Sequence, residues 1–226
     1  MQRDEALTRL RALGASERDA EILWRHFDDA EQRGKLGHGH SRIEWLETQD
    51  FDIATLGYLV LDQAVEDAIR EPPEEPRLVV LDRCFPTGML GHYTRRLAEA
   101  GLVSLLTTTS PPRLGPPGGP KLAGTNPLSI GIPGDPPVVV DVSMGAVTWG
   151  DVIAGLADEE QLVPFGGEQW HKAFALALGL QLLVDALVRE PGHGAVLLVA
   201  RPESDPVPAL RAAAAGVRLP GDKTSP

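Results

Sequence analysis

The densest group of side chains that could do chemistry lies in RGKLGHGHSR, residues 33–42. Three glycines in six residues disfavour a regular helix and let the backbone approach another group closely. His38 is a candidate proton donor because the charge of imidazole changes near neutral pH. Arg42 is a candidate anion clamp because its planar guanidinium can bind a carboxylate through two hydrogen bonds. This short loop therefore holds both a proton-transfer group and an anion-binding group.

Two other interpretations of the histidines in this loop are possible. A lone histidine in a polar loop is more often an exposed side chain than a catalytic one. His38 and His40 could also be two ligands of a metal ion, but no third ligand stands at a recognisable spacing. The single Cys84 makes neither an internal disulfide nor a cysteine-based metal site. We therefore predict no metal site.

A second candidate group is the carboxylate of Asp141, at the end of a predicted buried strand. Val138, Val139 and Val140 follow two prolines and run into Asp141. A β-branched run of this length, bounded by Pro and Gly, is typical of a buried strand. A carboxylate at its end stands at the edge of the core, where binding sites are common. Asp141 is thus a candidate for orienting a histidine or stabilising its charged form.

Several short motifs are shared with one enzyme family. They are PGG at 117–119, GTNP at 124–127, LVPFGG at 162–167 and VRLPGD at 217–222. In this order they resemble the type-2 malate/L-lactate dehydrogenase family, which includes sulfolactate, ureidoglycolate and Δ1-piperideine-2-carboxylate oxidoreductases. The chain looks like a shortened, divergent member. The resemblance implies a non-Rossmann fold and use of NADH or NADPH, and no Gly-x-Gly-x-x-Gly follows a strand here.

The resemblance also implies roles for particular residues. His38 falls on the catalytic histidine, Asp141 on its carboxylate partner and Arg42 on the arginine that holds the substrate carboxylate. Gly37 replaces a family serine, and the family's second histidine would fall near Pro86. The positions that match cofactor contacts are Ser110, Thr125, Asn126, Ser143 and Lys172.

The implied function is an NAD(P)H-dependent oxidoreductase with His38 as proton donor. Its substrate would be a small 2-oxo or 2-hydroxy acid or a cyclic imino acid. The two missing polar groups favour an imine, because a protonated imine is already electrophilic. The alternative is a catalytically repurposed member that binds a partner or a metabolite. A homodimer is expected, because the family places its sites near a subunit interface.

Hydrophobic periodicity predicts an α/β protein with a mixed or antiparallel central sheet flanked by helices. The predicted strands are 78–81, 102–107, 137–141 and 195–200, and the predicted helices are 3–13, 16–33, 53–70, 88–100, 173–189 and 208–215. We expect one compact unit over 1–226. Its parts are a helical region at 1–75 that carries the His38 loop, a sheet and cofactor region at 76–200, and a tail at 201–226.

Charge and composition narrow the class of protein. A net charge of −11 argues against a nucleic-acid binder, which needs a basic face. The most apolar stretch, 173–188, contains Gln181 and Asp185, so no membrane span is predicted. The charged N-terminus is unlike a signal peptide, and a cytoplasmic location is expected. An anionic cofactor would need local cations, and the candidates are Arg33, Arg42, Arg113, Lys121, Lys172 and Arg218.

Overall fold

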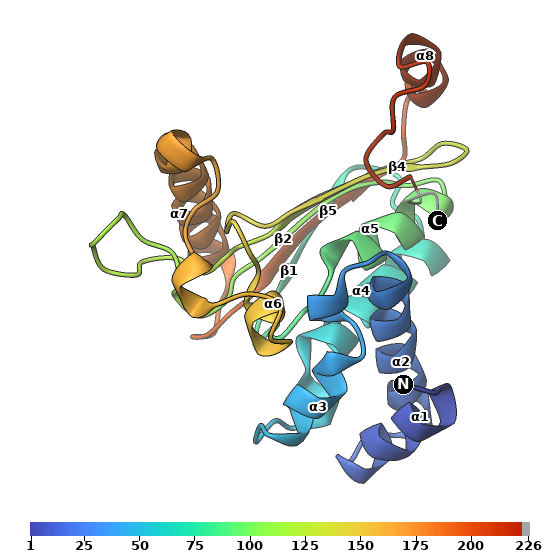
Figure 1. The fold of residues 1–226 in the computed structure, drawn as a ribbon. Helices are drawn as coiled ribbons and strands as arrows, with labels where there is room; N and C mark the ends of the chain where they lie inside the picture. The colour runs from blue at the N-terminus through green and yellow to red at the C-terminus, as the bar shows by residue number, and fades with distance from the viewer. Residues whose placement is uncertain (223–226) are drawn as a thin grey trace.

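A five-stranded antiparallel sheet forms the centre of the protein (Figure 1). The structure is a computed structural model and describes residues 1–222. The strand order is β1-β5-β2-β3-β4, and every neighbouring pair is antiparallel. The strands are β1 (Arg77–Leu81), β2 (Val103–Thr108), β3 (Leu128–Ile132), β4 (Val138–Val142) and β5 (Ala195–Ala200). The predicted helix-flanked antiparallel sheet is confirmed.

Helices from the first hundred residues cover one face of this sheet (Figure 1). The α-helices are α1 (Arg3–Ala12), α2 (Glu17–Gln32), α3 (Ser41–Glu47), α4 (Gly57–Arg70), α5 (Leu90–Glu99), α6 (Trp149–Ile153), α7 (Trp170–Leu187) and α8 (Val207–Ala213). Short 3-10 turns are η1 (Leu36–His38), η2 (Ile53–Thr55), η3 (Glu159–Gln161) and η4 (Gly167–Gln169). Helix α5 packs on β2, β3 and β4, while α4 packs on α5 and β1.

The core between this helical layer and the sheet is built from aliphatic side chains at alternating strand positions. Leu106 and Leu197 point from β2 and β5 toward Leu61 of α4 and Leu97 of α5, and all four are fully buried. Cys84 belongs to the same cluster, and burial raises the pKa of its thiol, so it packs as a core side chain. Burial of this apolar area is the main force that fixes the helices on the sheet.

Strand β3 was not predicted from the sequence. Its residues Ser129 and Gly131 face α5, where a larger side chain has no room. A Cβ on Gly131 would lie 2.9 Å from the Oγ of Ser104, and Ser129 is buried against Thr94, whose hydroxyl lies 2.7 Å from its own. Small and polar residues therefore occupy the buried face and hide the alternation that marks a strand.

Helix α7 lies on the opposite side of the sheet from α4 and α5 and packs against β2 (Figure 1). With the turn before it, Gly167–Leu187 is long and apolar enough to cross a membrane by length and composition alone. One such helix is weak evidence for a span, because a core helix passes the same test. Only 17% of its apolar window is buried, however, so α7 is not a core helix of this chain as it stands.

Candidate active site

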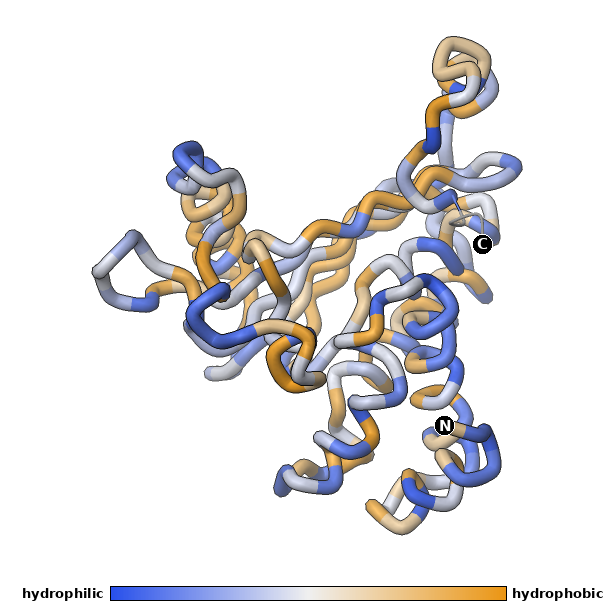
Figure 2. Tube along the Cα trace, in the orientation of Figure 1, coloured by the Kyte–Doolittle hydropathy of each residue, from blue (hydrophilic) through white to orange (hydrophobic). Residues whose placement is uncertain are grey.

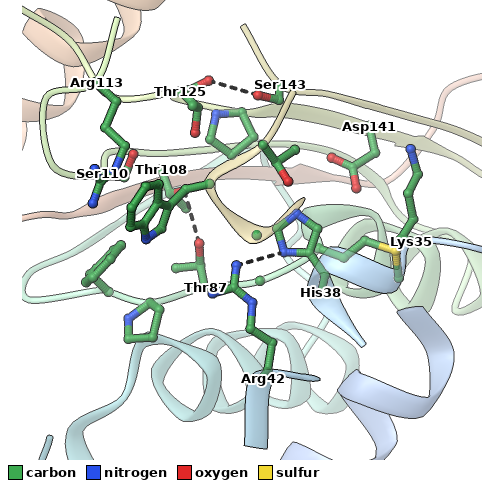
Figure 3. A pocket seen from close by; sticks show the side chains of 18 of the residues that line it. Lys35, His38, Arg42, Thr87, Thr108, Ser110, Arg113, Thr125, Asp141 and Ser143 are labelled. Atoms are coloured by element: carbon green, nitrogen blue, oxygen red, sulfur yellow. Dashed lines mark hydrogen bonds between the residues drawn. The ribbon is translucent and has the colours of Figure 1, made fainter. Parts of the chain in front are cut away.

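A cavity of about 110 Å³ opens between the helical layer and one end of the sheet (Figure 3). Its walls come from segments far apart in the sequence: the η1–α3 segment, the loop before α5, the ends of β2 and β4, and the start of α6. Six of the eight residues predicted from the sequence line it: His38, Arg42, Ser110, Thr125, Asp141 and Ser143. The cavity therefore gathers the predicted proton donor, anion clamp and carboxylate.

His38 and Arg42 enter the cavity from consecutive short helices. Because η1 ends at His38 and α3 begins at Ser41, the two side chains are one helical turn apart and face the same way (Figure 3). The Nη2 of Arg42 lies 3.4 Å from the Nδ1 of His38. Burial, together with the charge of Arg42, lowers the pKa of His38 to about 3. The imidazole is therefore neutral at physiological pH.

Arg42 is itself held away from solvent. Only 5% of the residue is exposed, and within residues 1–222 its buried Nε has no hydrogen-bond partner. A buried donor without an acceptor costs about 1–3 kcal/mol of free energy. An anion that entered the cavity would supply the missing acceptor and neutralise the charge.

The backbone of Gly37 touches that of α6. A Cβ on Gly37 would lie 2.6 Å from the backbone nitrogen of Asp151 and 2.7 Å from the carbonyl carbon of Gly150. A Cβ on Gly150 would in turn lie 2.7 Å from the Nη2 of Arg42. These distances leave no room for a side chain on either residue. The serine that the family resemblance implies at position 37 is therefore replaced by a close contact between η1 and α6.

Asp141 reaches the cavity from the end of β4. Its side chain points to the helical face of the sheet, where Oδ2 accepts a 2.8 Å hydrogen bond from the backbone N–H of Gly91 at the start of α5. Burial raises the pKa of this carboxyl to about 6, although the Gly91 hydrogen bond opposes the shift. Near neutral pH, Asp141 can thus either hold or release a proton.

Hydroxyl groups line the wall between Asp141 and the end of β2. The Oγ of Ser143 donates to the carbonyl of Thr125 at 3.5 Å, and the hydroxyls of Thr87 and Thr108 lie 3.2 Å apart (Figure 3). Ser110 follows β2 and faces the same space. Three of the five predicted cofactor residues therefore share one polar wall, and Thr87 and Thr108 join them without having been predicted.

Two predicted cofactor residues lie elsewhere. Asn126 is fully buried, and its amide donates 2.9 Å hydrogen bonds to the carbonyl of Ala177 and to Oε1 of Gln181 on α7. Its Oδ1 accepts from the backbone N–H of Ser110. Lys172 is exposed near the start of α7 and lines neither this cavity nor the basic cleft described below. Asn126 therefore supports the cavity wall without lining the cavity. Within residues 1–222 of one chain, no contact supports a cofactor role for Lys172.

Two features at or behind the cavity wall were not predicted from the sequence. The guanidinium carbon of Arg113 lies 3.3 Å from the centre of the Trp149 ring, a cation–π contact. Arg113 was recognised only as a scattered cation, and Trp149 falls in a segment without a motif. The second feature is His26, which is buried; its Nε2 accepts a 3.0 Å hydrogen bond from the N–H of Met89 and so fixes the loop before α5.

A larger cleft of about 390 Å³ adjoins the cavity and shares Lys35, Met89 and Asp141 with it. We call it the basic cleft; its cationic lining residues are Arg33, Lys35, Arg95 and Arg218. The chain around Pro220 forms one wall, since its carbonyl accepts a 3.0 Å hydrogen bond from Val139 at the free edge of β4. The buried Nε of Arg95 has no hydrogen-bond partner within residues 1–222.

Comparisons with known proteins bear on the family and the fold of the chain. A sequence profile of the malate/L-lactate dehydrogenase family matches residues 53–162. The match covers just under half of the chain, and over that segment the chain is similar to this family. A (2R)-3-sulfolactate dehydrogenase (NADP(+)) of Chromohalobacter salexigens is 29% identical over 174 residues, which cover 66% of this chain and 52% of the relative. A Δ1-pyrroline-2-carboxylate/Δ1-piperideine-2-carboxylate reductase of Pseudomonas aeruginosa is 32% identical over 137 residues, 49% of this chain and 40% of the relative. The chain thus spans about half the length of these relatives.

Solved structures share the fold. A dehydrogenase from Sinorhizobium meliloti superposes with a TM-score of 0.77 at 23% identity, covering 99% of this chain and 86% of the other. Malate dehydrogenase from Pyrococcus horikoshii OT3 gives a TM-score of 0.77 at 18% identity and covers 99% and 83%. At these identities the likeness establishes the fold, and the chemistry of this chain has to be argued from its own residues.

Proposed function

We propose that the protein is a nicotinamide-dependent oxidoreductase that acts on a small 2-oxo or 2-hydroxy acid or a cyclic imino acid. The observation that carries the proposal is the meeting of His38, Arg42 and Asp141 in one cavity, from segments up to 103 positions apart. Curated relatives named as a sulfolactate dehydrogenase and an imino-acid reductase support the reaction class.

Arg42 would bind the substrate carboxylate. Its guanidinium is buried and faces the cavity, and its Nε lacks an acceptor. A carboxylate provides two acceptor oxygens in the plane of the guanidinium fork, which fixes the orientation of the substrate as well as its position. Arg113 adds a second cation at the mouth, which favours acids that carry another anionic group.

His38 would exchange the proton. In the oxidising direction, its neutral imidazole can accept the proton of a substrate hydroxyl. In the reducing direction it must carry a proton when the reaction starts. Burial lowers the pKa of His38 most and the charge of Arg42 lowers it further, so a carboxylate bound to Arg42 would offset this second contribution and raise the pKa of His38. Asp141 lines the same cavity but makes no hydrogen bond to His38 within residues 1–222, so its carboxylate, with a pKa of about 6, would stabilise the charged imidazole without direct contact.

The basic cleft fits the phosphates of a dinucleotide. It adjoins the cavity, holds four cationic residues and leaves the buried Nε of Arg95 without a partner. When bound, a reduced nicotinamide supplies the hydride for the C=O or C=N group. Ser110, Thr125 and Ser143 lie on the wall where they could orient a nicotinamide amide, while Arg95 and Arg218 would hold phosphate oxygens.

The decisive experiment titrates the purified chain with NADH and NADPH and follows nicotinamide fluorescence. A panel of sulfopyruvate, oxaloacetate, pyruvate and Δ1-piperideine-2-carboxylate is then assayed for cofactor oxidation. We expect saturable binding of one cofactor below millimolar concentration and turnover of at least one acid. Binding without turnover would favour the repurposed member, and no binding at millimolar cofactor would refute the proposal.

A further inference from the structure

The start of helix α5 is held by side chains from two distant segments. Met89, the residue before α5, makes no side-chain hydrogen bond that would cap the helix. Its N–H instead donates to the Nε2 of His26 on α2 at 3.0 Å, and the N–H of Gly91 donates to the Oδ2 of Asp141 at 2.8 Å. The first N–H groups of a helix lack partners within the helix and need such acceptors. One turn of α5 therefore joins a buried imidazole to the carboxylate of the active-site cavity.

The hydrogen bond from Met89 accounts for a histidine at position 26. Hydrophilic and hydrophobic residues alternate along α2 (Figure 2), and His26 lies on its buried side, 1% exposed. The ring packs against Tyr58 and Tyr93, with centroids 4.9 and 5.2 Å away. Its buried Nδ1 has no hydrogen-bond partner within residues 1–222, a cost that an apolar side chain would avoid. The acceptor for Met89 is what the imidazole adds to this packing.

The acceptor nitrogen of His26 stays free of a proton. Burial lowers the pKa of His26 well below its usual value, and positive charge on the surrounding groups lowers it further; these groups are His92, His38, Arg42 and Arg96. A neutral imidazole whose Nε2 accepts a hydrogen bond carries its proton on Nδ1. The contact with Met89 is therefore kept across the neutral pH range.

Helix α2 holds the same turn of α5 at a second point. The Oδ2 of Asp29 lies 2.9 Å from the Nδ1 of His92, and the Nε of Arg33 donates to the other oxygen of Asp29 at 2.7 Å. His26 and Asp29 are one turn apart on α2, as Met89 and His92 are at the start of α5. The two contacts fix the direction of the first turn as well as its position.

The position of this turn matters because Gly91 touches Asp141. A Cβ on Gly91 would lie 3.0 Å from the Oδ2 of Asp141, so the backbone and the carboxylate are already in close contact. The bond from Gly91 opposes the burial that raises the pKa of Asp141 to about 6, and the charges of Lys35 and Arg95 act in the same direction as this bond. His38 faces the carboxylate across the cavity. A small movement of the turn would weaken the bond and with it the negative charge of Asp141.

We propose that His26 is a positioning residue of the active site: its Nε2 holds the first turn of α5 in the place from which the N–H of Gly91 binds Asp141. His26 lines neither the cavity nor the basic cleft, so it acts through α5. The catalytic importance of this hold rests on the proposed function, whereas the hold itself is a property of the ligand-free protein.

Carbon-13 NMR titration of the Asp141 carboxyl in the ligand-free protein tests the inference, with Asp141→Asn to assign the signal. We expect the pKa of Asp141 to rise by about one pH unit in His26→Leu, because two or three N–H bonds lower a carboxyl pKa by about two. His26→Gln should restore it, since Gln places an oxygen as many bonds from Cα as Nε2. His40→Leu is the matched control, because His40 stacks on Trp24 and should leave the pKa unchanged.

Circular dichroism checks that each variant is folded. An unchanged pKa of Asp141 in folded His26→Leu, or an equal rise in His40→Leu, would overturn the proposal. Nitrogen-15 NMR of the wild type needs no variant: the Nε2 of His26 should resonate as an unprotonated nitrogen between pH 6 and pH 8. A proton on Nε2 in that range would also overturn the proposal.

Kinetics separate this inference from the proposed function. With an acid that the protein turns over, the acidic limb of kcat/KM should move to higher pH in His26→Leu and return in His26→Gln. A variant that only loses stability, with its acidic limb in place, would give His26 a structural role and overturn the proposal. If no acid is turned over, the proposed function fails, and the NMR titration still decides whether His26 holds the turn that binds Asp141.

Discussion

The Nη2 of Arg42 lies 3.4 Å from the Nδ1 of His38, so a permanent cation stands beside the only cavity-lining histidine among residues 1–222. Burial makes protonation of His38 unfavourable, and the charge of Arg42 makes it more so. The contact also means that whatever neutralises Arg42 changes the proton affinity of His38. Anion binding and proton transfer are therefore coupled by a single contact.

The first prediction is that His38→Gln lowers kcat by about 10²–10⁴-fold, as expected when a general acid is removed. Cofactor affinity should change less than twofold, because the basic cleft does not contain His38. His40→Gln is the control, since His40 stacks on Trp24, with ring centroids 4.8 Å apart, and does not line the cavity. Steady-state kinetics and cofactor titration measure both effects. Equal losses in the two variants would rule out a specific role for His38.

The second prediction concerns the buried carboxylate of Asp141. Its folded-state pKa of about 6 exceeds the usual 3.8, so its stabilising contribution is complete below about pH 4 and is lost as the pH rises through 6. Asn cannot ionise and keeps an oxygen for the N–H of Gly91. Asp141→Asn should therefore be more stable than the wild type at pH 8, by up to about 3 kcal/mol, with little difference at pH 4. Urea unfolding at both pH values measures it; a variant less stable at pH 8 would show that the carboxylate has a favourable partner.

The third prediction is that Gly37→Ser destabilises the protein by about 1–3 kcal/mol, a typical cost of overpacking. The new Cβ would collide with the backbone of Gly150 and Asp151. Thermal unfolding should show the loss, and activity should fall although the serine that the family resemblance implies is restored. Gly34→Ser is a control for the serine itself, because no atom lies within 4 Å of a Cβ there, although its φ of +69° adds some strain. Increased activity without loss of stability would contradict the packing argument.

The fourth prediction tests the basic cleft. Arg95→Met should weaken cofactor binding by roughly tenfold or more, because a hydrogen bond to a charged group is worth about 1.5–3 kcal/mol. The loss should shrink as salt rises, since screening already weakens the contact in the wild type. Arg18→Met, in a groove between α2, α4 and β1, is the matched control. Unchanged cofactor affinity in Arg95→Met would remove the cleft from the proposed site.

The sequence predicted elements whose periodicity follows burial. Helix α2 is such a case: Ser16 caps it by accepting the N–H of Asp19, and its apolar positions recur at helical spacing. Helix α3 was missed because it follows three glycines and has only seven residues. Its burial depends on α1 and α6, contacts that a local pattern does not encode.

In the site, too, the sequence predicted the residues that a motif marks and missed those that depend on distant contacts. Motif resemblance identified His38, Arg42 and Asp141, and the structure brings all three to one cavity. Asn126 shares a motif with Thr125, but its backbone φ of +27° turns its side chain away from the cavity. The basic cleft escaped notice because Arg95 lies within an ordinary helix and meets Arg218 only through the tail that runs along β4.

The side chain of Asn126 connects the wall of the cavity to helix α7. One end of the amide holds the N–H of Ser110 on the cavity wall, and the other holds α7 through Ala177 and Gln181. Any force that shifts α7 must strain the same amide, and any ligand that moves Ser110 must do so as well. Because such linkage is reciprocal, occupation of the cavity and the packing of α7 would then influence each other equally through this one side chain.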